Sequence, residues 1–401
     1  MDLHETITGM GVKARAAAAA LRRLDTAAKN ATLLDIAGAL EADAAAIYAA
    51  NAEDVAAAES ANLAPAMVDR LRLTEARFSE MTAGVRHVAS LPDPVGETIW
   101  TREMPSGIAI RKVREPFGVV AVVFESRPNV FVDTAALCLK TSNAIILRGG
   151  KEARRTNMAL AATVAKALGP LAGAVQFVEV QDHEAVAELV RAVGLVDVAI
   201  PRGGERLIRA MCEAALIPVL KHYKGVCHIF VDDGADEDMA LRIIDNAKVQ
   251  RPSACNALES LLVARPIAER FIPLVREWAR EKGVRLHFGD APLDSEFLAL
   301  EMNVTAVDDC RAAIEHINKY SSHHSDAIIT ANAAHAAEFL RDVDSACVYH
   351  NASTRFTDGG QFGMGAEIGI STDKLHARGP MGLEELTTYK YVVTGEGAIR
   401  R

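Results

Sequence analysis

The chain has 401 residues, half of them hydrophobic and 24% of them charged, which is an ordinary globular composition, and the length predicts two or three domains. A formal net charge of -9 argues against a nucleic-acid binder, because such proteins need a basic surface. No apolar run reaches the ~18 residues that cross a membrane, no segment has the order of a signal peptide, and the six cysteines lack zinc-like spacing. These features predict a cytoplasmic protein with free thiols.

The N-terminal part predicts helices, because Ala, Leu, Arg and Glu dominate it and apolar residues recur at helical spacing, as in 33–40. Pro92 lies where this region ends. Two alternating segments follow, 97–103 and 108–114, and the sequence Pro-Ser-Gly at 105–107 separates them. Alternation on both sides of such a turn predicts a β-hairpin.

From Gly118 onward, short apolar segments alternate with helical stretches. The predicted strands of this first series are 118–124, 144–147, 175–178 and 196–200. A second series starts near residue 227, and its predicted elements are strand 227–231, helix 236–248, strand 258–263, helix 267–282 and strand 327–330. This alternation predicts parallel sheets covered on both faces, with ligands at the carboxyl ends of the strands. The segment 355–378 is glycine-rich and irregular, and 387–393 predicts a last strand.

Cys255 stands in a polar, proline-broken loop at 249–256, directly before the predicted strand 258–263. A thiol at such a junction can face a cleft, and Arg251 supplies positive potential that favours the reactive thiolate. Two interpretations remain at this point: a nucleophile that attacks a carbonyl, or a small buried thiol that fills the core.

Three other strand ends are rich in polar residues, namely 125–129, 148–152 and 201–205. Arg148 and Arg202 each begin an Arg-Gly-Gly turn that leads into a helix, and a helix N-terminus with a nearby cation suits phosphate. Each turn alone can be a tight βα connection. Two of them on adjacent units favour a diphosphate or a phosphorylated cofactor, although neither GxGxxG nor GxxxxGK[ST] is present.

The chain resembles the aldehyde dehydrogenase superfamily and, within it, the γ-glutamyl phosphate reductase (glutamate-5-semialdehyde dehydrogenase) branch. The resemblance covers nearly the whole chain. Its motifs here are FESRPNV at 124–130, ILRGGKE at 146–152, IPRGG at 200–204, QRPSACNA at 250–257 and the C-terminal pattern from 362 to 387. It implies an α/β, aldehyde dehydrogenase-like fold with two Rossmann-type parallel-sheet domains and a β-hairpin oligomerisation flap.

The resemblance implies that the cofactor is held by Arg148, Gly149, Gly150, Lys151, Arg202, Gly203, Gly204 and Glu296. Arg148 falls where the family often has a Lys that touches the adenosine ribose, and Glu296 matches the Glu that holds the nicotinamide ribose. Lys151 falls where NAD-preferring members often carry a Glu. Because a cation pairs with a 2′-phosphate but cannot accept from a ribose hydroxyl, NADPH is the expected cofactor.

The resemblance also assigns the chemistry. Cys255 matches the family nucleophile, and Asn129 matches the side chain that forms the oxyanion hole. The segment that carries the general base in aldehyde-oxidising members corresponds to 220–226 and contains no carboxylate. This departure favours reduction of an acyl phosphate over hydrolysis of a thioester. The implied reaction is NADPH-dependent reduction of γ-glutamyl phosphate to glutamate-5-semialdehyde with release of phosphate, through a cysteine thioester, in proline biosynthesis.

Substrate contacts are expected from Arg127, Arg251, Ser253 and His324, since the substrate carries a phosphate and an amino acid head. No metal is expected, because the adjacent histidines at 323 and 324 have no third ligand at suitable spacing. The partners expected are the small acyl phosphate and further copies of the chain, as a homodimer or homotetramer. The resemblance leaves open a transient complex with glutamate 5-kinase.

The expected domains are a cofactor-binding domain at 1–96 and 114–226, a catalytic domain at 227–384 and an oligomerisation flap at 97–113 and 385–401, with part of 361–384 able to return to the cofactor domain. Two alternatives remain. One is another enzyme of the superfamily, aldehyde-oxidising or CoA-acylating. The other is a catalytically silent relative that serves as a binding or structural protein.

Overall fold

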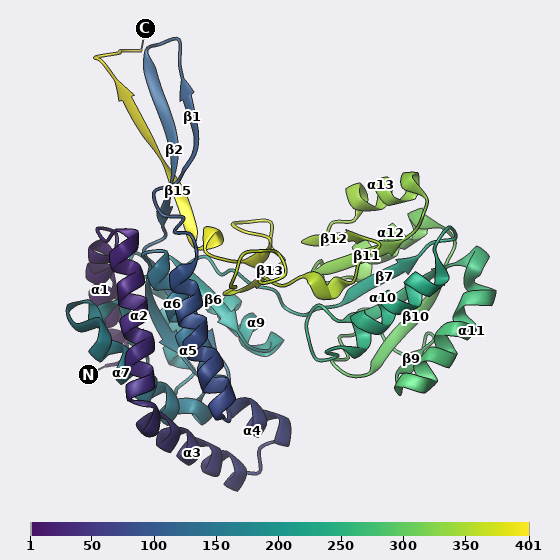
Figure 1. Cartoon of the computed structure of the whole chain (residues 1–401), viewed down its shortest axis with the longest axis horizontal. Helices are drawn as coiled ribbons and strands as arrows, with labels where there is room; N and C mark the ends of the chain where they lie inside the picture. Colours follow the sequence, from purple (N-terminus) through teal and green to yellow (C-terminus); the bar gives the residue numbers. More distant parts are fainter. Residues whose placement is uncertain (1, 401) are drawn as a thin grey trace. The chain divides into compact units, whose positions relative to one another are not determined.

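The computed structural model describes residues 2–400 and divides into two compact units (Figure 1). Unit 1 contains the chain up to Leu220 together with Met364–Gly369 and the C-terminal stretch from Met381. Unit 2 contains Lys221–Gly363 and Ile370–Pro380. The division between the units therefore comes before Lys221, ahead of the predicted boundary at 226/227, and two short segments of the glycine-rich region fall in different units.

Unit 1 begins with the predicted N-terminal helices. They are α1 (Leu3–Leu21), α2 (Thr26–Ala42), α3 (Ala44–Ser60), α4 (Pro65–Leu71) and α5 (Glu75–Ser90). Local capping explains two of these starts: the Asp25 side chain accepts from the backbone N–H of Ala28, and the Thr74 hydroxyl oxygen accepts from that of Arg77. Among them, α1 packs on the sheet, where it contacts β4 (Ala144–Arg148), whereas α2 packs against the helices α5 and α7 (Arg154–Leu168).

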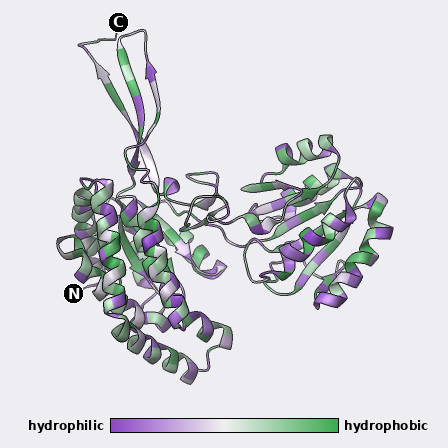
Figure 2. Ribbon diagram, viewed as in Figure 1, coloured by the Kyte–Doolittle hydropathy of each residue, from purple (hydrophilic) through white to green (hydrophobic). Residues whose placement is uncertain are grey.

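The sheet of unit 1 has four parallel strands in the order β5-β4-β3-β6. The strands of this sheet and the helices around it that have not yet been named are β3 (Val119–Phe124), α6 (Pro128–Lys140), η1 (Lys151–Ala153), η2 (Gly169–Ala174), β5 (Val175–Phe177), α8 (Glu184–Arg191), β6 (Val198–Arg202) and α9 (Glu205–Ala214). Every residue of β3 and β4 is buried, as a parallel sheet covered on both faces requires. Figure 2 shows the same concentration of hydrophobic residues in the strands.

The predicted hairpin forms β1 (Thr98–Glu103) and β2 (Ile108–Pro116), which pair antiparallel. The last strand, β15 (Thr387–Gly395), pairs antiparallel with β2 along its whole length. The result is a three-stranded arm that projects from unit 1 (Figure 1). Tyr389, Tyr391 and Val393 of β15 are each about half exposed, at 47%, 55% and 54%. The arm thus presents apolar side chains and an outer strand edge to solvent.

Unit 2 is built around a six-stranded parallel sheet in the order β12-β11-β7-β8-β10-β9. Its strands are β7 (Cys227–Val231), β8 (Leu258–Ala264), β9 (Arg285–His287), β10 (Glu301–Val307), β11 (Ser325–Ile329) and β12 (Cys347–His350). Its helices are α10 (Glu237–Val249), α11 (Arg265–Lys282), α12 (Cys310–Tyr320), α13 (Ala333–Asp342) and the short η3 (Thr354–Phe356). One apolar core joins the central strands to α10, α11 and α12.

The glycine-rich segment contributes two short paired strands, β13 (Gly369–Ser371) and β14 (Gly379–Met381), and η4 (Glu384–Leu386) precedes β15. No helix among the described residues is long and apolar enough to cross a membrane.

Candidate active site

Cys255 lies in unit 2, in the loop between the end of α10 and the start of β8, and its side chain is partly exposed. The next residue, Asn256, is buried and ties this loop to η3: its amide donates to the Thr357 carbonyl (2.8 Å), and its own backbone carbonyl accepts from the Thr354 hydroxyl (2.7 Å). Buried hydrogen bonds on the adjacent residue fix the backbone of the loop that carries Cys255. Cys255 can therefore present its sulfur in a defined direction.

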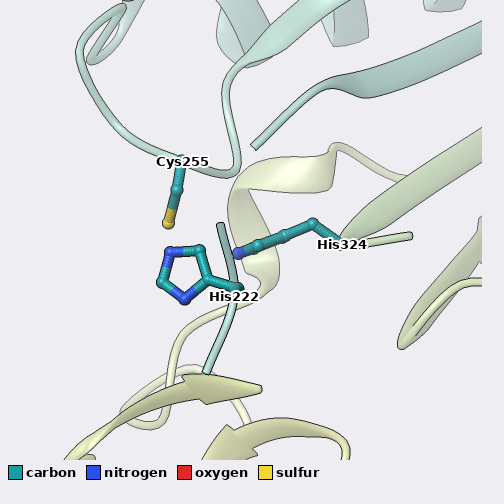
Figure 3. A group of neighbouring side chains, drawn as sticks. All are labelled: His222, Cys255 and His324. Carbon is teal, nitrogen blue, oxygen red and sulfur yellow. The ribbon is translucent and has the colours of Figure 1, made fainter. Parts of the chain in front are cut away.

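Two imidazoles stand beside the Cys255 sulfur (Figure 3). His222 lies in the segment before β7, and His324 lies immediately before β11. One ligand-type atom from each of the three side chains lies within 4.8 Å of the other two. The two rings meet edge to face, with centroids 5.5 Å apart. The three segments come together because β11, β7 and β8 are neighbours in the sheet and all run in the same direction.

Both imidazoles are oriented by a hydrogen bond at Nδ1. Nδ1 of His222 donates to the Ile370 carbonyl (3.0 Å), so in the neutral ring Nε2 carries the lone pair. Nδ1 of His324 hydrogen-bonds to the Ser325 hydroxyl (2.9 Å), and the chain of hydroxyl groups continues through Thr357. His324 is fully buried, whereas His222 is partly exposed. His222 is thus the imidazole better placed to exchange a proton with both the thiol and a bound molecule.

Gly225 holds the turn that carries His222 against the loop that carries Cys255. A Cβ added at this glycine would lie 1.8 Å from the Cys255 carbonyl oxygen, so no other residue permits this approach. The backbone N–H of Gly225 donates to the Glu296 carboxylate (2.7 Å). In this structure the carboxylate of Glu296, which was predicted to hold the nicotinamide ribose, therefore accepts from the turn beside Cys255.

A buried ion pair supports the segment that carries Glu296. Lys248 and Glu259 are fully buried and 2.9 Å apart, and the Glu259 carboxylate also accepts from the backbone N–H groups of Phe297 (3.3 Å) and Leu298 (3.4 Å). Burial raises the pKa of Glu259, and Lys248 opposes that shift. The pair thus connects α10 and β8 to the turn at Gly225 through the residues next to Glu296.

Positive charge comes from side chains at the edge of the unit 2 sheet where Cys255, His222 and His324 lie. α10 and α12 both end here, and a helix C-terminus carries partial negative charge, which disfavours anions. Arg251 is exposed, and Arg355 reaches the loop that carries Cys255, where it donates to Gln250 (3.0 Å) and Asn256. Burial lowers the pKa of Arg355, and the neighbouring Arg251 lowers it further, while Cys255 raises it. Ser253 is exposed in the same loop.

The predicted cofactor turn at β4 has the properties of a ligand cradle. Arg148 is 7% exposed and donates to the Gln181 carbonyl (2.9 Å), but its Nε has no hydrogen-bond partner among residues 2–400. A Cβ on Gly149 would lie 2.3 Å from the Asn157 amide, and one on Gly150 would lie 2.7 Å from the Glu152 carboxylate. Lys151 follows, exposed, at the start of η1. Bare backbone, an unsatisfied guanidinium N–H and an exposed ammonium fit a phosphorylated cofactor.

The second Arg-Gly-Gly turn is arranged differently. Gly204 caps α9, and its backbone N–H donates to the Glu125 carboxylate (3.1 Å). A Cβ on Gly203 would also meet Glu125, at 2.7 Å. At this helix start the Glu125 carboxylate already accepts from the backbone N–H of Gly204, so a phosphate there would have to displace it, whereas the Glu152 carboxylate near Gly150 accepts from the Ser126 hydroxyl. The geometry therefore favours the turn at Arg148 over the turn at Arg202 as a phosphate cradle.

Asn129 lies in the first turn of α6, exposed, and its amide donates to the Asp133 carboxylate one turn later (2.9 Å). Burial raises the pKa of Asp133 to about 6, and the bond from Asn129 opposes this shift. One amide N–H is thereby fixed, and the second remains for another acceptor. Arg127, the N-cap residue of the same helix, is also exposed. Both residues belong to unit 1, whereas Cys255 belongs to unit 2.

The aldehyde dehydrogenase family model matches residues 4–297. The γ-glutamyl phosphate reductase of Moorella thermoacetica is 49% identical over 420 aligned residues that cover 100% of both chains. That of Aquifex aeolicus is 48% identical, covering 97% of this chain and 95% of the relative. The chain belongs to the γ-glutamyl phosphate reductases of the aldehyde dehydrogenase family. The predicted resemblance is confirmed, and membership implies an oxidoreductase that works with a nicotinamide cofactor.

Solved structures agree with this assignment. The crystal structure of γ-glutamyl phosphate reductase from Thermotoga maritima is 42% identical, with a TM-score of 0.97 over 98% of this chain and 100% of that chain. An acetylating aldehyde dehydrogenase from Geobacillus thermoglucosidasius, 15% identical with a TM-score of 0.70 over 100% of this chain and 98% of that one, shares the fold. The predicted α/β fold class is confirmed.

Sequence reasoning did not assign a role to two residues near the thiol. His222 was noted only within a segment that lacks a carboxylate, and that segment nevertheless places an imidazole beside the sulfur. The inference that segment 220–226 lacks a general base therefore holds only for a carboxylate base, because the segment supplies the imidazole of His222. Arg355 is the first residue of the glycine-rich segment. Its positive charge was the one signal in the sequence that it could contact the phosphate of the expected substrate.

Proposed function

We propose that this chain catalyses the NADPH-dependent reduction of γ-glutamyl phosphate to glutamate-5-semialdehyde, with release of phosphate, as a step of proline biosynthesis. The observation that carries the proposal is a partly exposed thiol, Cys255, with the oriented imidazole of His222 beside it, in a chain 49% identical to a γ-glutamyl phosphate reductase. An acyl phosphate is a carbonyl compound with a good leaving group, which a thiolate attacks directly.

In the proposed first step, Nε2 of His222 accepts the Cys255 proton, and the thiolate sulfur attacks the acyl carbon. The C–O bond to phosphate breaks, and the imidazolium returns its proton to the departing phosphate oxygen. The product on the enzyme is a thioester of Cys255. His222 thus acts first as general base and then as general acid, and it ends the step in the protonation state in which it began.

In the proposed second step, the thioester carbon is reduced and the C–S bond then breaks, which releases the aldehyde and regenerates the thiolate. The nicotinamide cofactor, when bound, supplies the hydride for this reduction. Asn129 is proposed to donate its second amide N–H to the oxyanion in both steps, with a backbone N–H near Cys255. Such preorganised donors are worth roughly 2.7–4 kcal/mol each when removed.

Among the proposed cofactor residues, the cradle of Arg148, Gly149, Gly150 and Lys151 is best supported, for the reasons of geometry given above. Lys151 is proposed to pair with the 2′-phosphate and so to favour NADPH over NADH. The turn at Arg202 and the carboxylate of Glu296 stay predictions, and each must exchange an internal hydrogen bond for the cofactor.

For the substrate, we propose that Arg251, Ser253 and Arg355 receive the phosphate, since side chains must supply positive charge where two helices end. Arg127 and His324 stay predicted substrate contacts. The arm formed by β1, β2 and β15, with its exposed apolar side chains on β15, is proposed to join copies of the chain into a homodimer or homotetramer in the cytoplasm. A monomer at micromolar concentration in light scattering would contradict this oligomer.

The test is the reverse reaction. Glutamate-5-semialdehyde, NADP and inorganic phosphate are supplied, and the absorbance of reduced cofactor is followed. We expect turnover that requires phosphate, that is lost in Cys255→Ala, and whose pH profile changes in His222→Gln. Turnover without phosphate would indicate hydrolytic oxidation, acceptance of CoA in place of phosphate would indicate an acylating dehydrogenase, and the absence of turnover would indicate a silent relative. Cys212→Ser, a thiol in α9, is the matched control.

A further inference from the structure

The three side chains at the candidate nucleophile form a set of ligands that a soft divalent cation prefers. His222, Cys255 and His324 offer two imidazole nitrogens and one sulfur within 4.8 Å of one another (Figure 3). In tetrahedral zinc sites, bonds of about 2.0–2.3 Å separate neighbouring ligand atoms by about 3.3–3.8 Å. Closing this set around one ion therefore needs side-chain movements of roughly 1 Å.

The surroundings of both imidazoles are those of metal-binding histidines. Such histidines use their second ring nitrogen for a bond to a carbonyl, carboxylate or hydroxyl group, which fixes the ring and its tautomer. Nδ1 of His222 donates to the Ile370 carbonyl (3.0 Å), and Nδ1 of His324 bonds to the Ser325 hydroxyl (2.9 Å). When Nδ1 is the donor in both bonds, each Nε2 carries the lone pair that a cation needs.

The spacing along the chain concealed this arrangement. The expectation of no metal rested on neighbouring histidines without a third ligand, whereas the three ligands come from the segments before β7, β8 and β11. The partial exposure of His222 and Cys255 gives an ion access to the set, and the hydroxyl groups around His324 keep the buried side polar.

A second group of ligand-type residues, Asp232, Asp233 and His335, is less suited to zinc. Its donors are mainly oxygen, and the Asp232 carboxylate already accepts from Thr330 (2.6 Å) and pairs with His335 (2.8 Å). Zinc in proteins is bound chiefly by sulfur and nitrogen, so the group around Cys255 is the stronger competitor.

We propose that His222, Cys255 and His324 bind one Zn²⁺ and that the ion reversibly blocks the thiol. On binding, the Cys255 S–H bond breaks, its proton goes to the buffer, and the thiolate becomes a ligand. A water molecule completes the tetrahedron. Binding does not depend on the proposed reaction, but its consequence for turnover rests on Cys255 being the nucleophile. Zinc would then act as a reversible inhibitor of the reductase.

The binding experiment uses the full-length protein and Co²⁺ as a spectroscopic probe, with Zn²⁺ as competitor, in a buffer without phosphate. We expect one thiolate-to-cobalt charge-transfer band that one equivalent of Zn²⁺ removes. Cys255→Ser should abolish the band, and His222→Asn and His324→Asn should weaken zinc affinity at least about tenfold, since even outer-shell partners contribute that much. Cys212→Ser and His335→Gln should bind as the parent protein does.

Two further measurements keep the result independent of folding and of activity. Thermal unfolding identifies a variant that fails to fold, and mass spectrometry of the parent protein tests whether Zn²⁺ protects Cys255 from alkylation. Unchanged affinity in the three ligand variants, or loss of binding in His335→Gln, would overturn the site. Protein gel-filtered after zinc loading should be inactive and recover with EDTA. Full activity of zinc-loaded protein would overturn the block, whereas zinc binding to a protein without any reductase activity would contradict the proposed function alone.

Discussion

In the sheet of unit 1 the candidate residues follow the strands, whereas in the sheet of unit 2 the thiol and both histidines precede them. Helices begin at the first kind of edge, as η1 and α7 do after β4, and their N–H groups attract anions. Helices end at the second kind, as α10 does before Cys255. The comparison explains why bare glycine backbone would suffice in the proposed cofactor cradle, while arginine side chains would be needed beside the proposed nucleophile.

The expectation that ligands gather at the carboxyl ends of strands stays a prediction for the turns of unit 1, and it does not apply to Cys255, which precedes its strand. The sequence already placed this thiol before its strand, but strand order decides which loops become its neighbours. His222, Cys255 and His324 meet because β7 lies between β8 and β11. That order depends on packing between segments far apart in the chain, and no local pattern encodes it. The turn at Arg148, in contrast, was predictable because strand, glycines and helix are contiguous.

The largest effect should come from Gly225→Ala, which tests the edge in unit 2. Its Cβ would overlap the Cys255 carbonyl oxygen, so the loop that carries Cys255 must move, and displacements of about 1 Å cost about 100-fold in turnover. The measurement is phosphate-dependent turnover, with thermal unfolding alongside. Gly234→Ala, where the nearest atom lies 3.8 Å away, is the matched control. Equal turnover in both variants would show that the close approach at Gly225 is unimportant.

Next in size is the buried pair under the same edge. Lys248→Met leaves the Glu259 charge buried without its partner, which typically costs about 3–5 kcal/mol of the free energy of unfolding. The double variant Lys248→Met/Glu259→Leu should recover most of that loss, because it removes both charges. Urea unfolding of the two variants and the parent measures this. A double variant as unstable as the single one would show that packing, not charge, sets the loss.

The substitution Lys151→Glu tests the proposed cofactor cradle in unit 1. Reversing this exposed charge should raise the KM for NADP about tenfold or more, since hydrogen bonds to charged groups contribute about 1.5–3 kcal/mol, and should leave the KM for NAD nearly unchanged. Steady-state kinetics with both cofactors gives the ratio. Lys13→Glu on α1 is the charge-matched control. Parallel changes for the two cofactors would remove Lys151 from the 2′-phosphate.

The smallest effect concerns the carboxyl end of β7, where the hydrogen bond from His335 to Asp232 raises the histidine pKa above its usual 6.5. A raised pKa means that the folded state holds the proton more tightly. The contribution to stability is complete below about pH 6.5 and disappears as the pH rises through the folded-state value. Unfolding free energies between pH 6 and 8 should therefore fall slightly in the parent protein and stay flatter in His335→Gln; parallel profiles would exclude this histidine as the source.

The pairing of β2 with β15 has a consequence for biosynthesis. On the ribosome, the hairpin emerges before unit 2, whereas its partner strand β15 is translated only after all of unit 2. Until then the edge of β2 that later pairs with β15 offers unpaired N–H and C=O groups together with apolar side chains. This combination promotes aggregation of nascent chains. The arm is thus completed only after unit 2 has been translated, so chains truncated before β15 carry an open edge, and chaperones that shield extended strands are needed most while unit 2 is being synthesised.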